Sequence, residues 1–93
     1  MILHDPAIAA KILELLDARA DGATICPSDA ARALAHGDEA AWRALMPQVR
    51  RVADDLKARG LVRITAHGGE LASAQDAKGP IRLGRASRAD GTS

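Results

Sequence analysis

Three polar side chains able to contact nucleic acid lie close together in the middle of the chain, at positions 48, 50 and 51. The guanidinium groups of Arg50 and Arg51 can bind phosphate or, bidentately, guanine, and the Gln48 amide can bind adenine in the same way. Helical spacing places them outside the stripe that contains Val49 and Val52, which we expect to face the core. The pattern predicts a nucleic-acid contact on an exposed helix face.

Two acidic residues argue against that interpretation. Asp54 and Asp55 follow one turn later, where their carboxylates would repel phosphate. They can instead pair with Arg50, Arg51 or Lys57. An ordinary solvated helix face therefore stays open as the alternative interpretation of the same residues.

A second group of candidate phosphate ligands surrounds a predicted hairpin. Residues 61–65 are typical of a strand, Gly68-Gly69 allows a tight turn, and residues 70–72 return the chain as a second strand. A turn of two glycines can approach a sugar–phosphate backbone closely, and nearby basic side chains can hold phosphates. An ordinary hairpin turn explains the segment equally well. The candidate ligands of this group are Arg63, His67, Lys78 and Arg82.

The elements that must position these groups are signalled by capping residues and apolar spacing. Asp5 is the expected N-cap and Pro6 the first residue of a helix that ends near Gly22. Residues 23–25 are expected to be extended, a second helix runs from Pro27 to residue 35, and residues 38–46 form a short helix. Residues 80–83 are expected to form a further short edge strand, with Ile81 and Leu83 inward and Arg82 outward.

The predicted interface depends on Pro47. A proline inside a continuous helix loses a hydrogen bond and clashes with the preceding turn, at a cost of about 3 kcal/mol. We therefore expect Pro47 to begin a separate third helix that ends at Arg59-Gly60 and presents its arginines outward. An unbroken helix through Pro47, or burial of both arginines, would overturn this interface.

These elements predict a mainly α fold with a small β-hairpin, the arrangement of a winged helix-turn-helix with a three-helix core and a wing. Residues 1–84 form the expected domain and residues 85–93 a flexible C-terminal tail. The expected core contains Ile8, Ile12, Leu15, Leu34, Leu45, Val49, Val52 and Leu56, with Leu61, Ile64 and Leu71 from the hairpin.

Other chemistry-bearing residues favour structural roles. Trp42 and Met46 share a helix face and are expected to pack against the core, and Arg43 can pair with Asp29 or Asp38 or reach a phosphate. Cys26 precedes a helix start, where a thiol can become reactive, but we interpret it as a buried and inert cysteine. His4, His36 and His67 lack the spacing of metal ligands, and no catalytic constellation or phosphate loop is present, so we expect no enzyme, metal or cofactor.

The charge distribution is uneven although the net charge is only +1. Residues 1–42 carry three basic and seven acidic residues, a net charge of −4, and residues 43–93 carry ten and five, a net charge of +5. Such an asymmetry is consistent with a half that faces a polyanion, and equally with solvated helix faces. A single cysteine, no export signal and no membrane-length apolar run favour a cytoplasmic protein without a membrane partner.

Three ordered motifs carry a resemblance to known proteins. The run VRRVADDLKARGLV at residues 49–62 resembles the recognition helix and first wing strand of winged-helix transcriptional regulators. More specifically, TICPSDAARAL, AAWRALMPQVRRVADDL and GPIRL together resemble a family of small bacterial proteins with a winged-helix fold, a domain of unknown function. This resemblance covers about residues 7–84. It implies a fold and no activity or catalytic residue.

The leading functional prediction is non-catalytic binding of double-stranded DNA by the third helix and the wing. A homodimer is expected if the DNA target is palindromic, because one small module buries only about 600–1,000 Å² on DNA. The alternative is a winged-helix adaptor that binds another protein, which Asp54 and Asp55 on the third helix favour.

Overall fold

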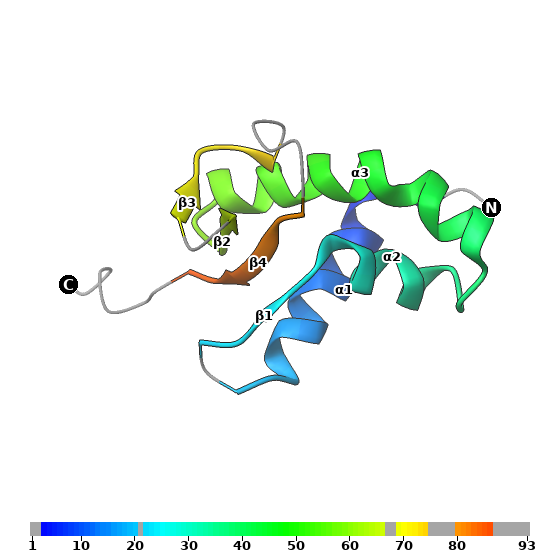
Figure 1. The fold of residues 1–93 in the computed structure, drawn as a ribbon, viewed down its shortest axis with the longest axis horizontal. Coiled ribbons are helices and arrows are strands. Elements are labelled where there is room, and N and C mark those ends of the chain that lie inside the picture. The colour runs from blue at the N-terminus through cyan, green and yellow to red at the C-terminus, as the bar shows by residue number, and fades with distance from the viewer. Residues whose placement is uncertain (1–2, 21, 67–68, 75–79, 87–93) are drawn as a thin grey trace.

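The computed structural model describes residues 3–20, 22–66, 69–74 and 80–86. Three helices, α1 (Asp5–Asp17), α2 (Pro27–Leu34) and α3 (Glu39–Ala58), are combined with four strands. The strands are β1 (Thr24–Ile25), β2 (Val62–Ala66), β3 (Gly69–Leu71) and β4 (Arg82–Arg85). The longest helix, α3, extends along most of the molecule and passes over α2 at one end and the sheet at the other (Figure 1).

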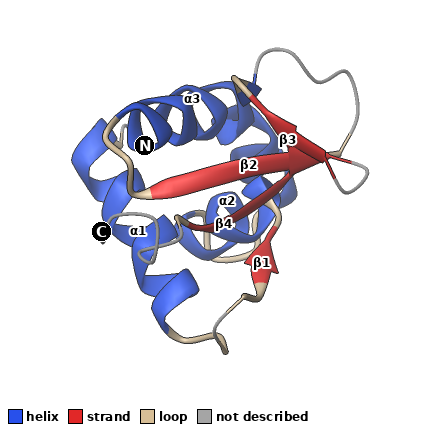
Figure 2. Ribbon diagram, turned by 90° about the vertical axis from the view of Figure 1, so that its left-hand side faces the viewer, coloured by secondary structure: helices blue, strands red, loops and turns tan. Residues whose placement is uncertain are grey.

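The four strands form one antiparallel sheet in the order β1-β4-β2-β3. Ile64 of β2 lies opposite Leu71 of β3 and Leu83 of β4, and the helices cover the face of the sheet to which Ile64 and Leu83 contribute (Figure 2). The prediction that residues 80–83 form an edge strand was wrong, because β4 lies between β1 and β2. Pro80 precedes the strand, so its missing N–H removes no hydrogen bond from the ladder.

The first residue of α1 also differs from the prediction. His4, not Asp5, occupies the N-cap position of α1, and Asp5 is the first helical residue. The start of α2 at Pro27 agrees with the prediction, and the helix ends at Leu34, one residue before the predicted end. Cys26, which was predicted to be buried, is only partly buried. Cys26 N–H donates a hydrogen bond of 2.9 Å to Asp29 Oδ2. This bond satisfies one of the backbone N–H groups at the start of α2 that have no acceptor within the helix.

The prediction that Pro47 begins a separate helix was wrong. One helix of 20 residues, α3, runs from Glu39 to Ala58 with Pro47 inside it. Pro47 and Arg43 are both exposed, so the Arg43 carbonyl, which lacks an N–H partner at position 47, can be hydrated. Asp38 caps this helix by accepting a hydrogen bond of 2.9 Å from Ala41 N–H, so the helix begins before the proline.

The core lies between the sheet and the three helices. The fully buried side chains include Ile8 and Ile12 of α1, Val49 and Leu56 of α3 and Ile64 of β2, as predicted. Leu15, Leu34, Leu45 and Leu71 pack against this core but are only partly buried. The prediction that Leu61 belongs to the core was wrong, since it is 45% exposed.

The fold is therefore mixed α/β and mostly helical, not mainly α with a small hairpin. The hairpin strands β2 and β3 join β1 and β4, which lie at the segments predicted to be extended before Pro27 and after Pro80, in one four-stranded sheet. The described fold includes Arg85, which pairs with Val62, one residue beyond the predicted domain limit at 84. Residues 87–93 of the predicted tail lie outside the described residues.

Candidate functional site

Gln48 and Arg51 both bind Asp5 at the start of α1. The Gln48 amide nitrogen donates to Asp5 Oδ1 at 2.9 Å and to the Leu3 carbonyl at 2.8 Å. Arg51 Nη2 donates to the same Asp5 oxygen at 2.9 Å. The hydrogen bond from Gln48, assisted by the positive charge of Arg51, lowers the pKa of Asp5 below its ordinary value. Two of the three predicted base-reading side chains thus connect α3 to α1.

The third predicted side chain, Arg50, contacts the chain that follows β3. Its Nη1 donates to the Ala74 carbonyl at 3.3 Å. One turn further along α3, Asp54 accepts hydrogen bonds from the Ser73 hydroxyl at 2.9 Å and from the Ala74 backbone N–H. Arg50 and Asp54 therefore hold residues 73–74 against α3, where Ala74 is fully buried.

The two described candidates of the hairpin group lie on neighbouring strands, Arg63 on β2 and Arg82 on β4, and both are exposed. Arg82 donates to Thr24 Oγ1 at 2.8 Å, the Thr24 carbonyl at 3.0 Å and Cys26 Sγ at 2.7 Å. It therefore clamps β4 to the junction of β1 and α2. The other two candidates, His67 and Lys78, lie outside the described residues.

Arg63 lies across Gly84 of β4. A Cβ atom added at Gly84 would lie 3.6 Å from Arg63 Nε and 3.3 Å from the Thr24 methyl group. The absence of a side chain at Gly84 therefore lets the Arg63 side chain lie close to the surface of the sheet. The two arginines occupy separate positions on the sheet, and only Arg82 is tied down by hydrogen bonds within the described part of the chain.

A cationic cluster at the junction of α2 and α3 was not predicted. The guanidinium carbon of Arg32 lies 4.6 Å, and that of Arg43 4.9 Å, from the centre of the Trp42 ring. Trp42 is half-buried and packs against the core, as its predicted structural role requires. Arg43 also pairs with Glu39 at 2.8 Å, not with Asp29 or Asp38. Arg32 and Trp42 are ten positions apart in the sequence, so only the packing of the two helices brings them together.

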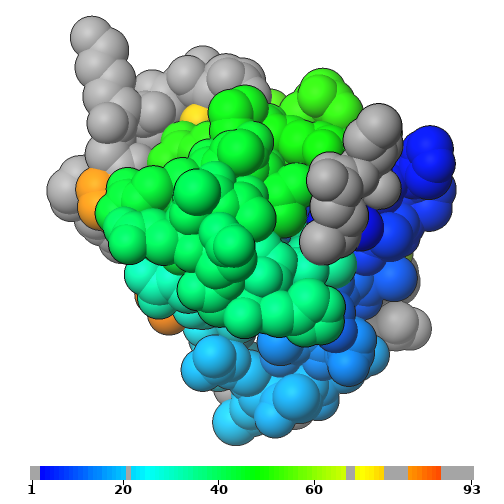
Figure 3. Space-filling view, turned by 90° about the vertical axis from the view of Figure 1, so that its right-hand side faces the viewer, coloured from blue at the N-terminus to red at the C-terminus, as the bar shows by residue number. Residues whose placement is uncertain are grey.

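The turn between α2 and α3 consists of residues 35–38 and shapes this cluster. His36 (φ 54°) and Gly37 (φ 84°) both have positive φ, which reverses the chain within four residues. The beginning of α3 lies directly above α2 on the face of the molecule shown in Figure 3. We call this surface the α2–α3 corner. It comprises the exposed residues Arg32 and Arg43, which flank Trp42, and the exposed residues Ala40, Ala44 and Pro47, which helical spacing places on the outer side of the start of α3, next to Arg43.

The exposed arginines of α3 have acidic partners within the molecule. Arg43 pairs with Glu39, Arg51 with Asp5, and Arg59 with Asp55, all at 3.0 Å or less. Asp55 therefore does not take the predicted partners Arg50, Arg51 or Lys57. Along the described length of α3, acidic residues precede and follow the arginines, and the helix does not carry an uninterrupted positive strip.

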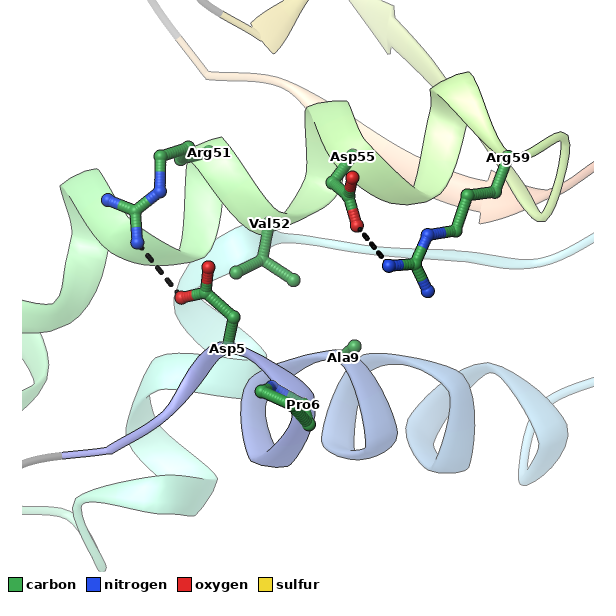
Figure 4. Close-up of a pocket in the computed structure, with 7 residues that line it drawn as sticks. All are labelled: Asp5, Pro6, Ala9, Arg51, Val52, Asp55 and Arg59. Atoms are coloured by element: carbon green, nitrogen blue, oxygen red, sulfur yellow. Dashed lines mark hydrogen bonds and ion pairs between the residues drawn. The ribbon is translucent and has the colours of Figure 1, made fainter.

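A groove of about 390 Å³ separates α1 from the second half of α3 (Figure 4). Its apolar lining is formed by Pro6, Ala9 and Val52, and the pairs Arg51–Asp5 and Asp55–Arg59 border it. A second hollow of about 240 Å³ lies at the end of α1. Pro6 and Ala9 line the first hollow and Leu13 and Leu16 the second, so both hollows follow one side of α1. We refer to both together as the α1–α3 groove.

Residues 5–86 match a family described as "Protein of unknown function (DUF3253)". The chain belongs to this family. The matched span begins at the first residue of α1 and ends one residue after β4, so this family's unit coincides with the described helices and strands. No curated protein matches the chain.

The family assignment brings no catalytic residue, and the structure adds two observations on the described part of the chain. No group of three or more His, Cys, Asp or Glu side chains in it is placed to hold a metal ion. None of its helices combines the length and the hydropathy that a membrane span requires.

Proposed function

We propose that this member of the family is a non-catalytic winged-helix module that binds double-stranded DNA through the α2–α3 corner. The observation that carries the proposal is the four-residue turn at 35–38, which places the exposed start of α3 beside α2. In helix-turn-helix proteins, two helices joined by such a turn bring the N-terminal residues of the second helix to the major groove. The β2–β3 hairpin that follows α3 supports a wing.

The side chains of the corner suit a close approach to DNA. Ala40, Ala44 and Pro47 are small and exposed, so the helix backbone can approach base edges, and an alanine methyl can contact a thymine methyl. Arg32 on α2 and Arg43 on α3 can reach phosphates. The Arg43–Glu39 pair is exposed, at 65% and 68%, and such pairs are weak enough to be exchanged for a phosphate.

This proposal moves the contact surface along α3. The sequence placed it at Gln48, Arg50 and Arg51, on a helix beginning at Pro47. Since α3 begins at Glu39, its first turns, and not residues 48–51, occupy the position of the groove-reading end. Gln48 and Arg50 bind other parts of the molecule, so their replacement is expected to affect stability more than DNA affinity.

The test is a fluorescence-anisotropy titration of labelled duplex DNA at several salt concentrations, for the natural protein and Arg32→Ala/Arg43→Ala. Each phosphate contact contributes about −0.9 to the slope of log K against log salt, so the double variant should flatten this slope by roughly 2. Arg59→Ala, an exposed paired arginine at the far end of α3, is the matched control. Absence of binding at low salt, or an unchanged slope in the double variant, would contradict the proposal.

A second candidate is a protein-binding adaptor, which the paired charges along α3 favour. Arg43, Arg51 and Arg59 each lie beside a carboxylate of the same molecule. Paired charges produce little net field and little attraction for a polyanion. A chain that does not bind duplex DNA at low salt, yet recovers one stoichiometric partner protein in a pull-down for which Arg50 and Arg51 are dispensable, would select this candidate.

A further inference from the structure

We propose that the α1–α3 groove is the contact surface of a symmetric homodimer, in which Leu61 of each copy is buried against the groove of the other. This inference goes beyond the proposed DNA binding and does not depend on it. It rests on an exposed leucine, an apolar groove beside it and the charges along its borders.

Leu61 stands out because it is the one large hydrophobic side chain among the described residues that is exposed. Its backbone is held on both sides: Leu61 N–H donates to the Leu56 carbonyl at 3.0 Å, and its carbonyl accepts from Ala86 N–H at 3.2 Å. The side chain therefore cannot enter the core through a small local adjustment. Covering it requires another surface, and the covered apolar area would favour association.

The surface next to Leu61 is apolar along its centre. Leu13 and Leu16 line the same hollow as Leu61, and Ala9 and Pro6 continue this lining along α1. These α1 positions follow helical spacing and form one continuous side of the helix. A leucine from a second molecule finds apolar atoms here and no buried charge that would have to be desolvated.

The borders of the groove identify the occupant. Three exposed ion pairs lie along them, and each contains one carboxylate and one guanidinium: Asp5–Arg51, Asp55–Arg59 and Asp17–Arg85. A polyanion would meet the carboxylates, and a strongly basic or acidic segment would meet a like charge in every pair. A second copy related by a two-fold axis instead places each acid of one chain where it can meet a base of the other, twice over. This balance of charge favours self-association over the other partners.

The experiment is sedimentation velocity on the complete chain, without nucleic acid, from low micromolar to several hundred micromolar concentration. The natural protein should show a monomer–dimer equilibrium, and Leu61→Glu should raise the dissociation constant about tenfold or more, about 1.4 kcal/mol of association free energy. Ala7→Glu is the matched control: it lies on α1, is exposed and does not line the groove. Circular dichroism checks that both variants are folded, which the exposure of both positions leads us to expect.

A charge exchange tests the two-fold pairing separately. Arg59→Asp should weaken the dimer, because its groove then carries two neighbouring carboxylates, and Asp55→Arg/Arg59→Asp should restore it. A natural protein that stays monomeric at every concentration would overturn the proposal. So would a dimer that Leu61→Glu leaves unchanged, or one that the exchanged pair does not restore. These outcomes are independent of the DNA titration, so the two proposals fail separately.

Discussion

The two halves of α3 differ in what they contact. In the second half, Val49, Val52, Ala53 and Leu56 are buried in the core, whereas none of the residues 39–47 is. The first half rests on α2 with half-buried side chains, Trp42 among them, and exposes its other side. One helix thus contains a segment that builds the fold and a segment that presents a surface.

Polar contacts follow the same division. In the second half, Gln48 binds the start of α1, and Asp54 binds residues 73–74 beyond β3. In the first half, Arg43 pairs with Glu39 one turn away on α3 itself. Polar contacts with distant segments fix the second half of α3 in place, whereas the Arg43–Glu39 pair lies within the first half and leaves its outer side free to bind a partner. The difference teaches that exposure on a helix is informative about function only after the tertiary contacts are known.

The largest expected effect compares two leucines, one in each half. Leu56→Ala removes a side chain that is 1% exposed and should lower the free energy of unfolding by about 2–5 kcal/mol. Leu45→Ala acts at a partly buried site, where less apolar area and less cavity are involved, and should cost under about half as much. Urea denaturation followed by circular dichroism measures both. Equal losses would contradict the division of α3.

A middle-sized effect is expected where the two halves meet. Pro47→Ala restores a backbone N–H that can donate to the Arg43 carbonyl, and it replaces a residue that disfavours helix interiors by about 3 kcal/mol. The unfolded chain also becomes freer, which offsets about 0.4–1 kcal/mol of the gain. We expect a net stabilisation of about 1–2 kcal/mol in the same urea experiment. A destabilised Pro47→Ala would mean that the proline itself is needed to join the two halves.

The smallest effect concerns the contact that holds the second half of α3 to α1. The pKa of Asp5 lies below its ordinary value of 3.8 in the folded protein, chiefly because of the hydrogen bond from Gln48. On acidification, the Asp5 carboxylate of the unfolded chain therefore takes up its proton at a higher pH than that of the folded protein. The contribution of Asp5 to the free energy of unfolding is fully present above about pH 4. It is lost as the pH falls through the lower folded pKa.

Unfolding curves measured from neutral pH to about pH 3 test this linkage. Asp5→Asn should reduce the loss of stability on acidification relative to the natural protein, and Glu14→Gln, in an exposed pair with Lys11, is the matched control. If Asp5→Asn showed the same acid dependence as the natural protein, the carboxylate would not be the group that titrates.

Much of the local structure was predictable from the sequence. Pro27 marked the start of α2, and the spacing of Ile8, Ile12 and Val52 marked buried helix faces, because helix-start signals and periodicity are properties of neighbouring residues. The alternation of Ile81, Arg82 and Leu83 likewise predicted which side chains of that segment are buried.

The candidate site was less predictable, because its residues depend on distant partners. Nothing near Gln48 or Arg51 in the sequence indicates that Asp5, more than 40 positions away, accepts their hydrogen bonds. Arg32 and Trp42 meet only because the turn at 35–38 packs α2 against α3. The prediction that Pro47 begins a separate helix failed for a similar reason, since the packing of α3 on both sides of the proline outweighs the local cost of a proline inside a helix.

The sequence by itself determined where most helices and strands lie and which of their faces are apolar, since these follow from interactions over a few residues. Only the tertiary structure decided that α3 continues through Pro47, that β4 enters the middle of the sheet, and that Leu61 stays outside. Each of these outcomes depends on the sum of contacts between segments that are far apart in the chain. That sum is set by packing and cannot be read from any one segment.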